Sequence, residues 1–112
     1  MFASLTYFYM IKMKNVILSA DGDSIIYSVP DAVADNLEKY CIEFCGEWLH
    51  KSPDAEKYRI GNIVCYTEAD FINYLNKYIF PEEKSVLVKN IGWTNLGKDI
   101  PEQYKNCPYF NF

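Results

Sequence analysis

The sequence contains few of the residues with which proteins usually perform chemistry or bind nucleic acids. One arginine, one histidine and five glycines occur among its 112 residues, and the net charge is −4. The lysines are scattered singly along the chain, whereas nucleic-acid-binding proteins usually gather basic side chains into a stripe that displaces counterions from phosphates. No glycine-rich phosphate loop and no nucleophile–base pair is visible. We therefore expect no nucleic-acid partner, no cofactor and no catalytic residues.

Long apolar runs are also lacking. The stretch from Phe2 to Ile11 carries no charge, but it is shorter than the ~20 residues that a membrane-spanning helix needs. Lys12 and Lys14 follow this stretch, although a signal peptide carries its positive charge ahead of the apolar run. We therefore predict a cytoplasmic protein with no membrane partner.

Residues 1–12 allow two interpretations. Leu5, Tyr7 and Tyr9 belong to an alternating pattern that is typical of an extra edge strand. The segment is equally well explained as an artefact of an upstream start, with Met10 or Met13 as the true first residue. Both interpretations remain open. Residues 13–112 are predicted to form a single globular domain, because a chain of this length buries enough surface for one core.

Aromatic residues are abundant, with ten tyrosines, seven phenylalanines and two tryptophans. Aromatic side chains bury large areas, and tyrosine keeps a polar group that suits contact surfaces as well as cores. Half of the residues are hydrophobic and 23% are charged, which indicates a folded chain. The preference for lysine over arginine is typical of AT-rich genomes and suggests a bacterial or phage origin.

The first half of the chain predicts a hairpin followed by a long helix. Two β-rich runs at residues 16–20 and 24–29 flank Asp21-Gly22-Asp23, a sequence that favours a tight turn. Apolar residues then recur at helical spacing over residues 31–50. Phe44 and Trp48 lie at the centre of the apolar arc, so we expect both to be nearly fully buried. Replacing Phe44 with alanine should then cost about 3–5 kcal/mol.

The second half predicts a strand, a helix and another strand. The strands are expected at residues 60–66 and 85–91, and the helix between them begins at a capping box, Thr67–Asp70. The sequence Val86-Leu87-Val88 is apolar on both faces of its strand, which favours a place inside the sheet. This strand–helix–strand unit fits a right-handed crossover between parallel strands. A short helical turn near residues 99–106 and an aromatic tail follow.

Together these elements predict an α/β fold at the boundary with the α+β class. We expect a single-domain two-layer sandwich in which a mixed four-stranded sheet carries two helices on one face. The expected order is β-β-α-β-α-β, followed by a short C-terminal helix.

The residues with chemical potential are scattered. Cys41 and Cys45 are one helical turn apart, but Cys41 lies in the apolar arc, where a free cysteine behaves as a small hydrophobe. We predict that these two, together with Cys65 and Cys107, neither bind a metal nor form disulfides. An enzyme would have to join residues that are far apart in sequence. The set considered is Asp21, Asp23, His50 and Cys65.

Candidate partner-binding residues are the aromatic side chains outside the regular elements and two glutamates on the polar face of the first helix. They are Trp93, Tyr109, Phe110 and Phe112, with Glu43 and Glu47 as a second, acidic contact. The tail residues either fold back onto the core or contact a partner, since tyrosine and tryptophan are enriched at binding hot spots.

The favoured function is a non-enzymatic protein-interaction module of the immunity, inhibitor or accessory type. The alternatives are a small-ligand-binding domain and a minor enzyme with a non-obvious site.

Overall fold

A β-hairpin forms the centre of the fold, as the sequence predicts. The computed structural model describes residues 12–20, 22–94 and 99–112, so the interpretations of residues 1–11 and of Asp21 lie outside the described residues. Strands β1 (Met13–Ser19) and β2 (Asp23–Pro30) pair antiparallel. Gly22 next to the turn has a φ of 102°, a conformation that glycine adopts without steric cost.

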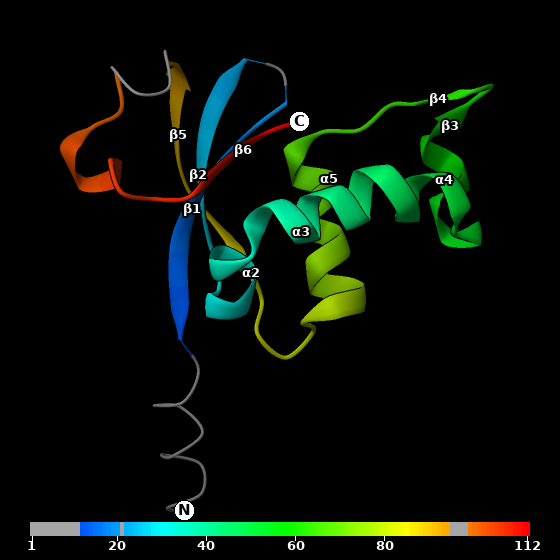
Figure 1. Ribbon diagram of the computed structural model, residues 1–112, viewed down its shortest axis with the longest axis horizontal. Helices are drawn as coiled ribbons and strands as arrows, with labels where there is room; N and C mark the ends of the chain where they lie inside the picture. The colour runs from blue at the N-terminus through cyan, green and yellow to red at the C-terminus, as the bar shows by residue number, and fades with distance from the viewer. Residues whose placement is uncertain (1–11, 21, 95–98) are drawn as a thin grey trace, which may run out of the picture.

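Two further strands complete a mixed four-stranded sheet with the order β5-β2-β1-β6 (Figure 1). Strand β5 (Val86–Trp93) is antiparallel to β2. Strand β6 (Tyr109–Asn111), from the aromatic tail, is parallel to β1. The described residues form one compact α+β domain, and the predicted two-layer fold class is confirmed.

The prediction for residues 60–66 is wrong in one respect. Strands β3 (Arg59–Ile60) and β4 (Ile63–Val64) pair only with each other and form a separate hairpin. Gly61 opens its two-residue turn with a φ of 62°, which matches the positive φ that such turns require. This hairpin takes the place of the predicted crossover, and the tail supplies the fourth strand of the sheet.

The predicted interior position of residues 85–91 is also wrong. β5 is an edge strand, and Val86, Leu87 and Val88 are exposed by 54%, 61% and 45%. The sequence pattern indicates apolar character on both faces, which is typical of buried strands. Here the strand that was expected beside it has formed its own hairpin, so nothing among the described strands covers the outer edge.

The predicted first helix is present but interrupted. It consists of α2 (Asp31–Asp35), α3 (Leu37–Ile42), the π-helical segment η1 (Glu43–Trp48) and α4 (Leu49–Lys51). Asn36 separates α2 from α3 with a φ of −135°. A 3₁₀ segment, η2 (Pro53–Tyr58), follows. The only arginine, Arg59, donates from Nη1 to the carbonyl of Leu49 at 2.9 Å, which satisfies a carbonyl at the helix end.

The second helix matches its prediction closely. It runs through α5 (Glu68–Tyr74) and a π-helical segment, η3 (Leu75–Ile79). The capping box is confirmed, because the backbone N–H of Thr67 donates to the Asp70 carboxylate at 2.9 Å. A single 3₁₀ turn, η4 (Glu102–Tyr104), is the short terminal helix.

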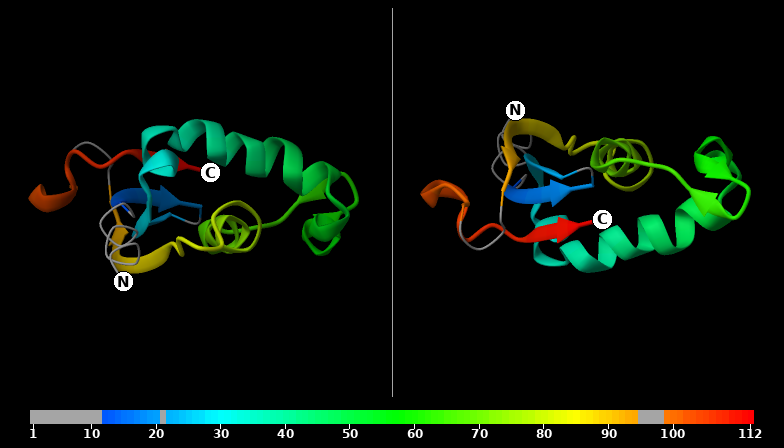
Figure 2. Two further views of the ribbon diagram at one scale, coloured as in Figure 1. Left: turned by 90° about the horizontal axis from the view of Figure 1, so that it is seen from below. Right: turned by 90° about the horizontal axis from the view of Figure 1, so that it is seen from above.

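The helices lie on one side of the sheet and η4 lies on the other (Figure 2). The main core joins the helix-facing residues of the hairpin, such as Val16 and Leu18, to the inner faces of both helices. Ile17 and Ile26 face the other way and pack with Tyr104 in a smaller cluster. Each strand of the hairpin therefore has both of its faces covered, which explains its continuous apolar sequence.

Phe44 lies at the centre of the main core, where it is 0% exposed, as predicted. It contacts five other rings. They are Trp48, Tyr66, Phe71, Tyr74 and Phe112, with centroid distances of 5.1 to 6.3 Å. Trp48 is only half-buried, so the expectation of nearly full burial is wrong for this residue. One flank of the tryptophan borders an open cleft instead of the core.

Candidate functional site

The structure divides the predicted aromatic contact residues into two groups. Phe110 and Phe112 pack against the core. The ring of Phe112 lies 5.6 Å from that of Phe71 and 5.7 Å from that of Tyr66. Its backbone N–H donates to the carbonyl of Ser19 at 2.8 Å. These tail residues therefore close the fold and are only partly available to a partner.

Trp93 and Tyr109 are exposed by 74% and 60%, but they do not form one patch. Trp93 ends β5 opposite Asp23, whereas Tyr109 begins β6 opposite Ile17. The two strands lie at opposite edges of the sheet, with β2 and β1 between them. A single partner surface centred on both residues is therefore not what the fold presents.

The two edges of the sheet differ in their surroundings. Beside β6, a groove of about 780 Å³ lies between the α2–α3 segment and the chain from Lys105 to Tyr109, so a helix flanks this edge. β5 pairs with β2 alone among the described strands. The side chains of Val86, Leu87 and Val88 on this strand are exposed, and the exposed Trp93 lies at its end. The sequence does not reveal this surface, because the same apolar run predicts an interior strand.

Side-chain hydrogen bonds hold both ends of β5 in place. At its start, the Asn76 side chain accepts from the backbone N–H of Ser85 at 2.7 Å and donates to the carbonyl of Ser85 at 3.0 Å. At its other end, Asn90 donates from Nδ2 to Asp23 at 3.2 Å. The hydroxyls of Ser24 and Thr94 are 2.7 Å apart. These hydrogen bonds hold the edge strand in an extended conformation.

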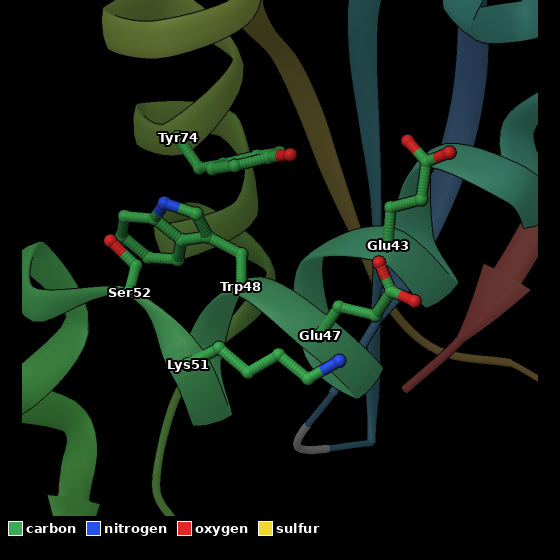
Figure 3. Close-up of a pocket in the computed structure, with 6 residues that line it drawn as sticks. All are labelled: Glu43, Glu47, Trp48, Lys51, Ser52 and Tyr74. Atoms are coloured by element: carbon green, nitrogen blue, oxygen red, sulfur yellow. The ribbon is translucent and has the colours of Figure 1, made fainter.

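The two predicted acidic contacts, Glu43 and Glu47, line an open cleft of about 370 Å³. Trp48 and Tyr74 form its aromatic side, and their ring centroids are 5.0 Å apart. Lys51 completes the charged lining. Figure 3 shows the two rings on one side of the cleft and the two glutamate side chains on the other.

The cleft is acidic and aromatic. Neither glutamate forms an ion pair among the described residues, where the ion pairs are Lys14–Asp35 and Lys105–Glu102. Burial raises the pKa of the Tyr74 hydroxyl, and the charges of Glu43 and Glu47 raise it further. Tyr74 therefore stays protonated at neutral pH and can donate a hydrogen bond, while the glutamates supply acceptors.

Glu43, Glu47 and Trp48 lie in the π-helical segment η1, and Tyr74 ends α5 immediately before the π-helical segment η3. The backbone N–H of Leu49 donates to the carbonyl of Phe44, and that of Phe80 donates to the carbonyl of Leu75 at 2.7 Å. Bonds between residues five apart widen the turn. In an ordinary α-helix, Trp48 would lie on a different face from Glu43, five residues earlier. The wider turn in η1 brings the two side chains to the same side of the helix. π-Helical turns occur frequently at functional sites.

The cysteines occupy different environments. Cys41 is buried, Cys45 and Cys107 are half-buried and Cys65 is exposed, and all four are free thiols. Burial raises the pKa of the Cys41 thiol far above its usual value and also raises that of Cys107. Among the described residues, no group of three or more His, Cys, Asp or Glu side chains could hold a metal ion.

The residues of the enzyme hypothesis are not joined. Asp23 begins β2, His50 lies in α4 and Cys65 follows β4. No hydrogen bond or ion pair in the described part of the chain links any two of these three residues. No helix within residues 12–20, 22–94 and 99–112 is long and apolar enough to cross a membrane.

Comparisons with known proteins add no further information on the site. The chain matches no model of a known protein family, no curated protein and no solved structure.

Proposed function

We propose that the protein is a small cytoplasmic, non-enzymatic interaction module of the immunity, inhibitor or accessory type. It binds an extended segment of a partner protein along the outer edge of β5. The observation that carries this proposal is an eight-residue strand that pairs with a single described strand and presents three consecutive exposed apolar residues at positions 86–88.

An edge strand of this kind suits the addition of a partner strand. Its outward backbone N–H and C=O groups supply the hydrogen bonds, and side chains beside them supply selectivity. The hydrogen bonds of the Asn76 and Asn90 side chains support the same function, because an edge strand that is already ordered loses little conformational entropy on binding. Trp93 provides an exposed aromatic anchor of the type found at hot spots. The net charge of −4 favours a protein partner over a nucleic acid.

The edge has features that limit unwanted pairing. The register between β2 and β5 shifts between Ile26 and Tyr27, which leaves Val88 without a partner residue in β2. Lys89 follows it. A bulge and a lysine are common protections of edge strands against aggregation. They leave Val86 and Leu87 as the accessible apolar centre for a specific partner.

The test compares two charge-introducing substitutions at equally exposed positions. Leu87→Lys alters the proposed surface, and Ile63→Lys alters the β3–β4 hairpin, where the side chain is 60% exposed. Both variants should keep their stability within about 0.5 kcal/mol, because neither side chain is buried. The candidate partners are the products of the adjacent genes, and binding is measured by calorimetry.

We expect a partner to bind the wild type and the Ile63→Lys variant equally, and Leu87→Lys to weaken binding at least tenfold. Hydrogen exchange should show new protection of backbone amides in residues 86–93 when the partner is bound. A partner that binds Leu87→Lys as tightly as the wild type, without protecting these amides, would contradict the proposal.

A further inference from the structure

We infer that the cleft between η1 and α5 binds the guanidinium group of an arginine side chain carried by the partner protein. This inference rests on the proposed function, because it assigns a second contact to the same kind of partner. The cleft is a different surface from β5, so the arginine site and the β5 contact can be refuted independently.

The aromatic side of the cleft suits a cation. Trp48 and Tyr74 line it with their rings tilted by 54° to each other. Aromatic faces attract cations through their quadrupole, and tryptophan is the strongest of the natural rings in this respect. Trp48 also contacts Phe44, at a centroid distance of 5.9 Å, and Tyr78 at 5.2 Å. Its orientation is therefore fixed before a ligand enters.

The opposite side of the cleft supplies the charge. Glu43 and Glu47 are one helical turn apart, a spacing at which two side chains on a helix are neighbours. Both line the cleft, and neither is neutralised by an ion pair in the described part of the chain. Two unpaired carboxylates beside two aromatic rings form a site for a group that is both planar and positively charged.

Arginine fits this arrangement better than lysine. Its guanidinium group is planar, stacks on aromatic rings and presents paired donors to carboxylates, whereas the ammonium group of lysine is a compact point charge. The cleft volume of about 370 Å³ is at the lower end of the range for ligand sites, so it suits one side chain. Lys51, at the rim, places a positive charge beside the site and should weaken the binding of any cation.

The test measures the intrinsic fluorescence of Trp48. In a Trp93→Phe background, Trp48 is the only tryptophan, and its fluorescence is followed during titration with the N-acetyl amides of arginine, lysine and glutamine. We expect a saturable change with the arginine compound, a weaker response with the lysine compound and none with the neutral glutamine compound. High salt should reduce the response.

Matched variants identify the carboxylates that act. Glu43→Gln and Glu47→Gln should each weaken arginine binding by roughly twofold to fivefold, as expected for charges at a surface. Glu38→Gln, on the same helical arm but outside the cleft lining, should leave the affinity unchanged. Lys51→Gln should tighten binding, because it removes the competing charge.

Two results of the arginine titration would overturn the inference. One is the absence of a saturable response to the arginine compound in folded protein. The other is a response that Glu43→Gln and Glu47→Gln leave unchanged. If a partner binds at β5 with an affinity that the two glutamine variants do not alter, the β5 proposal stands and the arginine contact on the partner is refuted. If a partner binds Leu87→Lys as tightly as the wild type but binds Glu43→Gln and Glu47→Gln more weakly, the β5 proposal fails and the arginine contact stands.

Discussion

Replacing Phe112 with alanine tests whether the aromatic tail is part of the core. The Phe112 ring contacts Phe44, Tyr66 and Phe71 with centroid distances of 6.3, 5.7 and 5.6 Å. A fully buried phenylalanine costs about 3–5 kcal/mol when it is truncated. Phe112 is half-buried, so we expect Phe112→Ala to cost about 2–3 kcal/mol. This is a large part of the ~5–15 kcal/mol that stabilises a typical domain.

Chemical denaturation followed by circular dichroism measures this loss, and thermal unfolding gives a second estimate. For a chain of this length, about 1 kcal/mol corresponds to roughly 4 °C in Tm, so the midpoint should fall by roughly 8–12 °C. Tyr109→Ala is the matched control, because Tyr109 lies on the same strand and is 60% exposed. Its effect should stay within about 0.5 kcal/mol. Equal, small effects of both substitutions would refute the conclusion that β6 closes the core.

Two further predictions concern ionisable groups. Cys65 should react rapidly with a thiol reagent in the native protein, whereas Cys41 should react only on unfolding, because it is 0% exposed and burial raises the pKa of its thiol; stoichiometric zinc or a disulfide in the purified protein would contradict the predicted free thiols. Burial, reinforced by Cys45, raises the pKa of Tyr66 to about 12. An unfolded tyrosine loses its proton near pH 10, so the contribution of Tyr66 is intact below that pH and is lost as the pH rises from about 10 to about 12. The loss of stability in this window should be smaller in Tyr66→Phe.

The features that could be predicted from the sequence depend on local interactions. The β1–β2 hairpin follows from two β-rich runs around a glycine, and Gly22 has the positive φ that this position needs. The start of α5 follows from Thr67 and Asp70, whose hydrogen bond lies within four residues of chain. In both cases the neighbouring residues alone determine the conformation, so no knowledge of the tertiary structure is required.

The sheet partners could not be predicted in the same way. Residues 59–64 and 86–93 both carry strand-forming sequences, and nothing local decides whether they pair with each other or separately. Gly61 allows a turn tight enough for Arg59 and Ile60 to pair with residues 63 and 64. That turn removes the strand that the crossover prediction placed beside β5. The apolar sequence Val86-Leu87-Val88 predicts a buried strand, but in the structure these residues are exposed on an edge strand.

The acidic-aromatic cleft could be predicted only in part. Glu43 and Glu47 were identified from their charge and their position on the polar face of the helix. Their proximity to Trp48 was missed, because an ordinary helical period places the tryptophan on the opposite, apolar arc. The π-helical turn in η1 changes that angle, and Tyr74 comes from a helix that is remote in sequence. No pattern in a single sequence signals a π-helical turn.

The two edges of the sheet together indicate where a partner is to be expected. The tail provides a strand for the β1 edge and places Phe112 in the aromatic core. The chain therefore uses its own residues to cover an edge that would otherwise present the apolar hairpin to solvent. The β5 edge receives no such cover from the described residues, although it is longer and carries more exposed apolar side chains. An edge strand that Asn76 and Asn90 hold in place, and that no described strand covers, differs from one that the fold closes. Since exposed apolar surface on a monomer commonly marks an interaction site, this difference supports β5, and not the tail, as the proposed partner surface.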